Sequence, residues 1–346
     1  MSGVLPPAAF VAALVLTALI AVPLKRLASR WGFTDRPGGH KAHARPTPYL
    51  GGIAIALVTV VITAVAAGLS DRRLTAILLA ATAVAALGLI DDVASLPAVT
   101  RLVVETVAAT GVVLAGVVLT VTGGWPDAPL TIVWIVVVTN SFNLLDNMDG
   151  ALGTVTVATA AFLAAIAFVL AQPALGLFLV VLAGAALGFL PHNWAPARMF
   201  MGDAGSLFIG FGLTCSAIVL VSGRGVDAVI AGLLLPTFVA TVDTGVVFLS
   251  RVRAGRSPLA GGTDHVSHRL RRLGFDTRMV AVVLGLIAML AGALCASMVL
   301  GLVPPLTAAI VAAGTAVAAV ALLQGVKVYA PRRPLENPPR IRERRG

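Results

Sequence analysis

The stretch Thr131-Ile-Val-Trp-Ile-Val-Val-Val-Thr-Asn-Ser-Phe-Asn-Leu-Leu-Asp-Asn-Met-Asp-Gly150 passes from an apolar run into a cluster of amides and carboxylates. Its polar side chains recur at every third residue, at Asn140, Asn143, Asp146 and Asp149. On a helix this spacing gives one slowly drifting polar face. Such groups are costly when they face lipid. The stretch therefore predicts a membrane-spanning helix that ends in a polar site, with hydrogen bonding between helices as the alternative.

The composition extends this interpretation to the whole chain. Of the 346 residues, 58% are hydrophobic and 12% are charged, whereas soluble domains have about 45–50% apolar and about 25% charged residues. These values exclude an ordinary globular protein, a coiled coil and a disordered chain. We expect an all-α polytopic membrane protein with about 10–11 transmembrane helices. The candidate runs are 4–24, 50–69, 74–90, 102–121, 128–145, 151–171, 173–190, 205–222, 226–250, 279–298 and 302–323.

The distribution of basic residues predicts the orientation. If the loop 25–49 is cytoplasmic and the runs alternate, only Arg72, Arg73 and Arg224 of the 25 Lys and Arg residues fall outside. This asymmetry follows the positive-inside rule. It predicts a multi-pass protein of the cell membrane, with its N-terminus outside and its C-terminus in the cytosol. The first run has no basic residue before it, so we interpret it as a retained span and not as a signal peptide.

The domain organisation is simple. We expect one integral-membrane domain over 1–325 and a basic, Pro-rich cytoplasmic tail over 326–346 that is disordered and contacts anionic lipid. The net charge of +10 fits a membrane surface and anionic substrates. No motif for nucleic-acid binding is visible, so nucleic acid is not an expected partner. Cys215 and Cys295 lie in apolar runs and suggest neither a disulfide framework nor a metal site.

Two further acidic motifs fall on the predicted cytoplasmic face. Asp91 and Asp92 end an apolar run and are followed by Arg101, which is suited to a lipid phosphate or to an i,i+4 pair with Glu105. The motif Gly202-Asp203-Ala-Gly-Ser206 begins another run. There Asp203 could bind a metal ion or merely cap the helix. Phe200, just before it, could stack on a base or simply pack. Together with the stripe Asn140–Asp149, these carboxylates suit Mg²⁺, which takes oxygen ligands and often binds with substrate phosphates.

Two basic segments complete the predicted cytoplasmic face. The loop 251–278 contains His265, His268 and Arg269, and its arginines suit a diphosphate; positive-inside charge alone is the alternative. The segment 40–52 carries Lys41 and Arg45 before a Pro- and Gly-rich helix start and could bind a substrate phosphate. Asp243, inside an apolar run, could face the site or pair with an arginine.

Taken together, these motifs resemble one family, the polyprenyl-phosphate N-acetylhexosamine-1-phosphate transferases (glycosyltransferase family 4). The resemblance covers about residues 40–275, with all motifs in order. It rests on Pro48–Gly52, Asp91-Asp92, Asn143–Gly150, Gly202–Ser206 and His265–His268. It implies a helical membrane enzyme with a cytoplasmic active site. The implied reaction is Mg²⁺-dependent transfer of a sugar-1-phosphate from a UDP-sugar to a polyprenyl phosphate, with release of UMP.

The resemblance also implies residue roles. Asp91 and Asp92 are catalytic carboxylates, and Asp203 is a metal ligand with Asp149 or Asp146 near the metal and the diphosphate. We expect Asp149 at the metal, with Mn²⁺ as an alternative ion, and expect Asp146 and His268 in catalysis. Substrate-binding residues are then Lys41, Arg45, Arg101, Asn143, Phe200, His265 and Arg269.

One departure bears on the substrate. The family often has His-x-His-His, whereas this chain has His265-Val-Ser267-His268. This favours the undecaprenyl-phosphate N-acetylglucosamine-1-phosphate branch over the phospho-N-acetylmuramoyl-pentapeptide branch. The expected partners are a UDP-N-acetylhexosamine, polyprenyl phosphate, membrane lipid and, as a further candidate, a second copy of the chain. The rival classes are a secondary transporter and a catalytically altered homologue with a scaffolding role.

Overall fold

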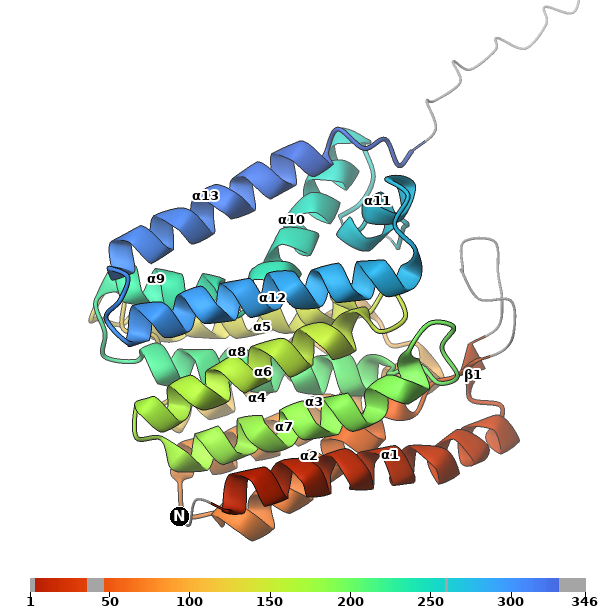
Figure 1. Ribbon diagram of the computed structural model, residues 1–346, viewed down its shortest axis with the longest axis horizontal. Helices are drawn as coiled ribbons and strands as arrows, with labels where there is room; N and C mark the ends of the chain where they lie inside the picture. Colours follow the sequence, from red (N-terminus) through yellow and green to blue (C-terminus); the bar gives the residue numbers. More distant parts are fainter. Residues whose placement is uncertain (1–3, 36–46, 259–260, 330–346) are drawn as a thin grey trace, which may run out of the picture.

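The computed structural model describes residues 4–35, 47–258 and 261–329. In that part of the chain it is a bundle of roughly aligned helices with one short antiparallel pair of strands, β1 (Thr34–Asp35) and β2 (Thr47–Pro48) (Figure 1). In chain order, the helices are α1 (Leu5–Trp31), α2 (Gly51–Ala67), α3 (Arg72–Ala94), α4 (Ala98–Leu114), α5 (Asp127–Leu145), α6 (Ala151–Val169), α7 (Pro173–Asn193), α8 (Asp203–Val221), α9 (Val226–Leu234), α10 (Phe238–Arg253), α11 (Val266–Arg272), α12 (Thr277–Val299) and α13 (Pro305–Leu323).

The predicted all-α, multi-pass architecture is confirmed. Within the described residues, eight helices are long and apolar enough to cross a membrane, and α9 with α10 forms a ninth candidate that is bent by 78°. Helix α2 is apolar but has 17 residues, slightly shorter than a usual span. Every predicted apolar run contains a helix, but not every run is one straight span.

Two predicted runs need correction. The run 102–121 extends too far, because α4 ends at Leu114. Beyond it, backbone N–H groups donate to side chains of the next helix: Leu119 to Thr131 Oγ1 and Thr122 to Asp127 Oδ1. The run 226–250 is broken around Pro236, which lacks an N–H to continue the helical ladder. The chain therefore leaves the bundle direction at α10, as Figure 1 shows.

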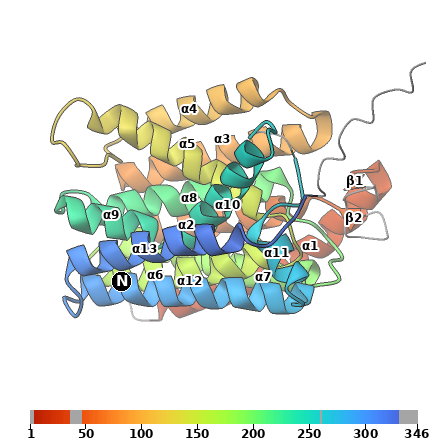
Figure 2. The same ribbon diagram turned by 90° about the horizontal axis from the view of Figure 1, so that it is seen from above.

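Helix α8 is the centre of the bundle. All its residues from Ala204 to Val221 are buried, and it packs against α3, α5, α2 and α9 (Figure 2). On one flank, α1 packs against α7, α7 packs against α6, and α6 packs against α12. In contrast, α13 is mostly exposed, as expected for a helix that faces lipid.

Small residues let the helices that carry the acidic motifs approach closely. A Cβ on Gly52 in α2 would lie 2.1 Å from the backbone nitrogen of Gly205 in α8. A Cβ on Gly88 in α3 would lie 2.5 Å from the carbonyl carbon of Asp203. The Gly52 N–H also donates to Met201 O at 2.8 Å. These contacts fix the start of α8 against the end of α3 and the start of α2.

We therefore expect Gly52→Ala to destabilise the protein by about 1–3 kcal/mol or more, because the added methyl overlaps backbone that cannot move aside cheaply. The matched control is Gly111→Ala in α4, where a Cβ would meet nothing within 4 Å. That change should be neutral or stabilising by up to about 1 kcal/mol, through helix propensity. Thermal unfolding in detergent measures both, and equal midpoints would contradict the close-packing argument.

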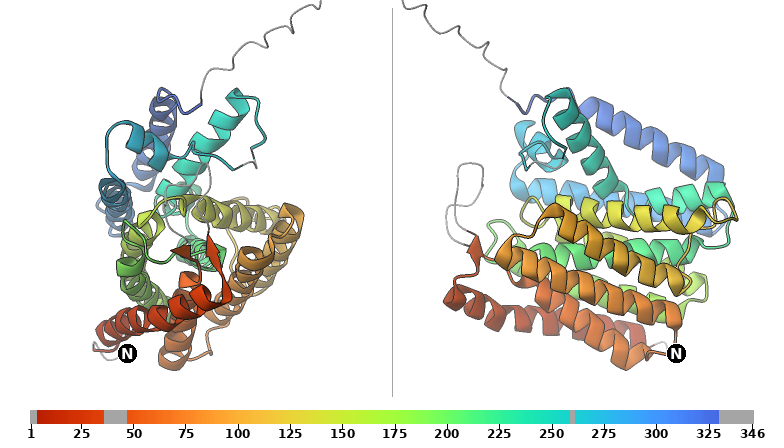
Figure 3. Two further views of the ribbon diagram at one scale, coloured as in Figure 1. Left: turned by 90° about the vertical axis from the view of Figure 1, so that its right-hand side faces the viewer. Right: turned by 180° about the vertical axis from the view of Figure 1, so that it is seen from behind.

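The polar motifs gather at one end of the bundle. The C-terminal ends of α3, α5 and α7 and the N-terminal ends of α2 and α8 lie there, close to β1 and α11. The first described residues of α1 lie at the opposite end (Figure 1). Figure 3 gives a view of the bundle from the end that carries β1.

Candidate active site

Asp203, the first residue of α8, is the meeting point of three helices. Asn143 near the end of α5 donates from Nδ2 to Asp203 Oδ1 at 2.8 Å and to Ser206 Oγ at 2.9 Å. Arg101 of α4 places Nη1 at 3.5 Å from Asp203 Oδ2. The Asp203 side chain is still 31% exposed, so it remains accessible to a ligand.

Asp91 and Asp92 have different surroundings, although they are adjacent in α3. Asp91 Oδ2 is ion-paired with Arg101 Nη1 at 2.7 Å, and its Oδ1 accepts the Leu96 N–H at 2.5 Å. Asp92 instead accepts two main-chain N–H groups of α8, those of Asp203 at 2.9 Å and Ala204 at 3.3 Å. Gly202, the residue before α8, supplies no side-chain cap. Asp92 therefore caps α8 from another helix, where a negative charge also suits the helix dipole.

Asp146 and Asp149 extend the acidic cluster past the end of α5. Asp149 Oδ2 accepts the Ala197 N–H at 2.8 Å, which ties this segment to the loop after α7. Burial, together with the charges of Asp203, Asp92 and Asp149, raises the pKa of Asp146 to about 8. Several carboxylates thus compete for ionisation in one small volume.

The site suits a divalent cation that is coordinated partly by substrate phosphates better than one that is coordinated by protein ligands alone. Within the described residues, no three His, Cys, Asp or Glu side chains are arranged as a preformed metal site. The acidic cluster nevertheless offers only oxygen ligands, and its crowded carboxylates would be relieved by a cation. Mg²⁺ commonly uses one or two carboxylates, several waters and phosphate oxygens. The donor set therefore fits this type of ion.

Helix α11 places the histidines of the loop 251–278. His265 Nδ1 lies 2.8 Å from Asp243 Oδ2, and the Val266 N–H donates to Asp243 Oδ1 at 2.7 Å. Asp243 is thus paired with a histidine and not with an arginine. Ser267 Oγ donates to Asn147 Oδ1, which joins α11 to the segment between Asp146 and Asp149.

His268 is the half-buried histidine of this loop, with its ring 5.7 Å from that of His265. Burial, together with the neighbouring His265, lowers the pKa of His268 to about 4. The imidazole is therefore neutral near pH 7.

Arg269 lies away from the carboxylates and is almost fully buried. Its guanidinium donates to the carbonyl oxygens of Asp264, Leu323 and Val326, and to Ser250 Oγ. Since its donors are used within the protein, this geometry supports an anchoring role rather than the predicted substrate contact. The neighbouring Asp264 pairs with Arg251 at 3.0 Å and accepts the Tyr329 hydroxyl at 2.6 Å. These bonds hold residues 326–329, the described part of the predicted tail.

Breaking the buried Arg251–Asp264 pair should destabilise this corner. Although burial raises the pKa of Asp264, hydrogen bonds from Arg251 and Tyr329 bring it below the ordinary value. The pair therefore contributes stability above the unfolded pKa of about 4 and loses it as the pH falls. We expect Asp264→Asn to cost about 3–5 kcal/mol. The control is Asp71→Asn at an exposed N-cap, where Asn serves equally well. Thermal unfolding at neutral pH measures both; equal stability of the two variants would contradict the prediction.

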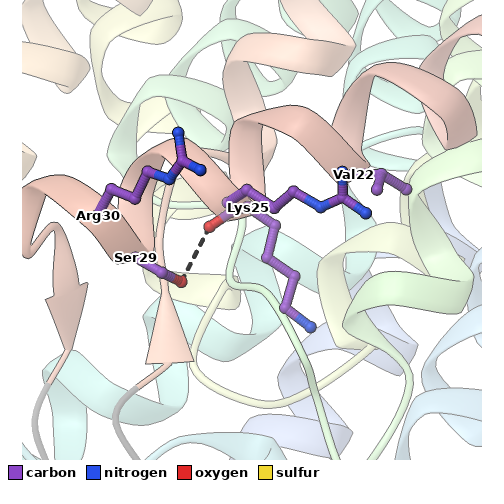
Figure 4. Close-up of a pocket in the computed structure, with 5 residues that line it drawn as sticks. Val22, Lys25, Ser29 and Arg30 are labelled. Carbon is purple, nitrogen blue, oxygen red and sulfur yellow. Dashed lines mark hydrogen bonds between the residues drawn. The ribbon is translucent and has the colours of Figure 1, made fainter.

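Other predicted residues have distinct positions. The Phe200 backbone bridges β2 and α2: its N–H donates to Pro48 O at 2.8 Å and its carbonyl accepts the Gly51 N–H at 3.1 Å. Lys41 and Arg45 lie outside the described residues. A hollow of about 440 Å³ lies on α1 and is lined by Val22, Lys25, Arg26, Ser29 and Arg30, none of which is a carboxylate (Figure 4).

Further polar contacts lie at this end of the bundle, and the one made by Asn140 is the hydrogen bonding between helices considered above as the alternative. Arg101 pairs with Asp91 and not with Glu105; the buried Glu105 instead accepts a hydrogen bond from Asn140. Asn193 accepts the Gly150 N–H at 2.9 Å and donates to Met199 O at 3.1 Å, which orients the loop around Asp149. The sequence signal was an amide at the end of an apolar run, as in the stripe Asn140–Asp149.

Comparisons with known proteins agree with this geometry. The family model described as glycosyl transferase family 4 matches residues 74–221. A Streptomyces coelicolor protein named as a glycosyltransferase is 41% identical over 93% of this chain and 77% of its own length. The "probable undecaprenyl-phosphate N-acetylglucosaminyl 1-phosphate transferase" of Bacillus subtilis is 33% identical over 81% of each chain. The decaprenyl-phosphate N-acetylglucosaminephosphotransferase of Mycobacterium tuberculosis is 31% identical over 79% of this chain and 77% of its own length.

The matched residues 74–221 include Asp91, Asp92, Asn143 and Asp203, the side chains that the fold brings together. The chain is therefore a membrane-embedded transferase that belongs to glycosyl transferase family 4, the family of the polyprenyl-phosphate N-acetylhexosamine-1-phosphate transferases.

Proposed function

We propose that this transferase moves N-acetylglucosamine-1-phosphate from its UDP-sugar to a polyprenyl phosphate, undecaprenyl or decaprenyl. The products are polyprenyl-diphospho-N-acetylglucosamine and UMP, which makes this the first membrane step of a cell-envelope polysaccharide. The observation that carries the proposal is the convergence of Asp91, Asp92 and Asp203 with Arg101 at one end of an apolar bundle. An enzyme that joins a soluble nucleotide sugar to a lipid needs such a site at a membrane surface.

The charge distribution supports an orientation in the membrane. Among the described residues, most of the Lys and Arg residues lie at the end of the bundle that carries the carboxylates, whereas Arg72, Arg73 and Arg224 lie toward the other end. By the positive-inside rule this end faces the cytosol, where nucleotide sugars are available. The first residues of the chain are then outside and the last residues inside.

Mg²⁺ is the proposed cofactor. Asp203 would hold it together with Asp149, with Asp91 and Asp146 close by, and waters and diphosphate oxygens would complete the coordination. When bound, it would neutralise the diphosphate and stabilise the leaving UMP. Mn²⁺ has the same preference for oxygen ligands.

The side chains bring two anions together. An oxygen of the polyprenyl phosphate attacks the sugar-linked phosphorus of the UDP-sugar, and the bond from that phosphorus to the UMP oxygen breaks. A phosphate monoester has a second pKa near 6 and is largely a dianion at neutral pH, so no strong base is required. Arg101, between Asp91 and Asp203, is placed to contact the incoming phosphate. Asn143 and Phe200 are the candidates for nucleotide contacts.

The direct test is UMP release by purified protein in detergent with Mg²⁺, polyprenyl phosphate and a panel of UDP-sugars. We expect lipid-dependent release with UDP-N-acetylglucosamine and little with the other donors. Release with UDP-N-acetylmuramoyl-pentapeptide alone would move the enzyme to the peptidoglycan branch. A burst of UMP without lipid, together with a trapped aspartyl intermediate, would contradict direct attack and favour covalent catalysis at Asp91 or Asp92.

The pH dependence follows from the state of His268. Because its pKa is about 4, His268 stays neutral across the working range. We therefore expect His268→Gln to leave the shape of the rate profile between about pH 5.5 and 8 unchanged. The measurement is kcat against pH for both proteins. The ordinary histidine pKa is about 6.5. An inflection near that pH that is present in the wild type and absent from the variant would contradict a neutral His268.

A further inference from the structure

A buried carboxylate inside the membrane domain is bonded to a histidine. Asp243 in α10 is fully buried, and its two oxygens have different partners. Oδ2 lies 2.8 Å from His265 Nδ1, and Oδ1 accepts the Val266 N–H at 2.7 Å. The same side chain thus fixes the ring of His265 and the first turn of α11.

This arrangement determines which ring nitrogen of His265 is available. An ionised carboxylate only accepts hydrogen bonds, so Nδ1 must carry the proton that is shared with Asp243. Nε2 makes no hydrogen bond to any residue that the structure describes. A histidine held in this way by a carboxylate presents one defined nitrogen to a ligand, as metal-bound and catalytic histidines do.

Helix α11, which begins directly after His265, is tied to the acidic segment. Ser267 is hydrogen-bonded to Asn147, which lies between Asp146 and Asp149. On the other side, Arg269 and the Arg251–Asp264 pair anchor the helix to α10 and to the end of α13. Helix α11 is therefore fixed on both sides, and its first turn contacts the segment 146–149, where the diphosphate is expected.

We propose that Asp243 is a positioning residue that holds His265 with Nε2 directed toward the phosphates of the nucleotide sugar. This inference rests on the proposed function of the same site. In the imidazolium form, His265 donates from Nδ1 to Asp243 and from Nε2 to a phosphate oxygen. Asp243 balances that charge on the opposite side of the ring.

The experiment is a double-mutant cycle of Asp243→Asn and His265→Gln in the full-length protein, read as kcat and KM for UMP release. Asn keeps the size of the side chain but offers Nδ1 a different partner. We expect Asp243→Asn to lower kcat about 10–100-fold with KM nearly unchanged. In the His265→Gln background the same change should cost less than about twofold, because the residue acts through His265. The matched control is Asp227→Asn in the first turn of α9, which should keep wild-type rates.

A purely structural role would give multiplicative losses in the double mutant and a lower folded fraction, and that result would overturn the proposal. A second readout does not need activity: ¹⁵N spectra of labelled histidines should show a protonated Nδ1 at His265 that changes in Asp243→Asn. An unchanged spectrum would also overturn the pairing. If the wild type releases no UMP with any donor, the proposed function fails, while the spectra still decide whether Asp243 controls His265.

Discussion

Replacing Asp203 by asparagine should reduce lipid-dependent UMP release by about 10³-fold or more, because metal-assisted charge stabilisation amounts to several kcal/mol of the barrier. Asparagine has the same shape, and its amide oxygen can still accept the hydrogen bond from Asn143 Nδ2. The loss should therefore come from the missing charge and not from unfolding. The measurement is the initial rate with Mg²⁺ and the best UDP-sugar, alongside thermal unfolding.

Asp227→Asn is the control for this prediction, since Asp227 lies in the first turn of α9, away from α3, α5 and the start of α8. It should keep wild-type rates. If Asp203→Asn retained more than about a tenth of the activity while folded, Asp203 could not be the main ligand for the cation or the diphosphate. That outcome would leave the enzyme class intact but move the metal to Asp91, Asp146 and Asp149.

Asp92 should show two separable effects. Asp92→Ala removes the acceptor of two N–H groups at the start of α8, so we expect a loss of about 1–2 kcal/mol in stability, as for a deleted helix cap. The start of α8 also carries Asp203, so activity should fall about 100-fold or more. Asp92→Asn keeps an acceptor oxygen and should recover most of the stability but little of the activity.

Thermal unfolding and initial rates of the two Asp92 variants separate these contributions. Equal stability of Asp92→Ala and the wild type would mean that the Asp92 carboxylate does not cap α8. Full activity in Asp92→Asn would mean that its charge is not needed, and would leave Asp91 as the carboxylate that acts on the phosphates.

The helical membrane fold was predictable because apolar length is a local property of the sequence. The predicted helix bounds are wrong where the hydrogen bonding of single residues ends a helix inside an apolar run. Thr131 and Asp127 accept N–H groups of the segment after Leu114, so the predicted run 102–121 is not one helix. Pro236 breaks the run 226–250, but the 78° bend depends on packing that hydropathy does not encode.

The sequence draws attention to the polar residues at this end of the bundle but not to their partners. A costly polar group at the end of an apolar run is visible in the sequence, as at Asp91, Asn143 and Asp203. Which groups meet depends on tertiary contacts, such as the close approach of Gly88 to Asp203. Arg269 illustrates the difference. A basic loop suggests phosphate binding, but this guanidinium donates to the main-chain oxygens of Leu323, the last residue of α13, and of Val326, just after it.

The most direct measurement follows the phosphorus atom itself. UDP-N-acetylglucosamine labelled with ³²P at the sugar-linked phosphate and with ¹⁴C in the sugar would be incubated with the enzyme, Mg²⁺ and polyprenyl phosphate. We expect both labels to pass into the lipid in equal amounts while unlabelled UMP is released. Transfer of ¹⁴C alone, with ³²P retained in UDP, would show attack at the sugar carbon and would contradict phosphoryl transfer at the site formed by Asp91, Asp92 and Asp203.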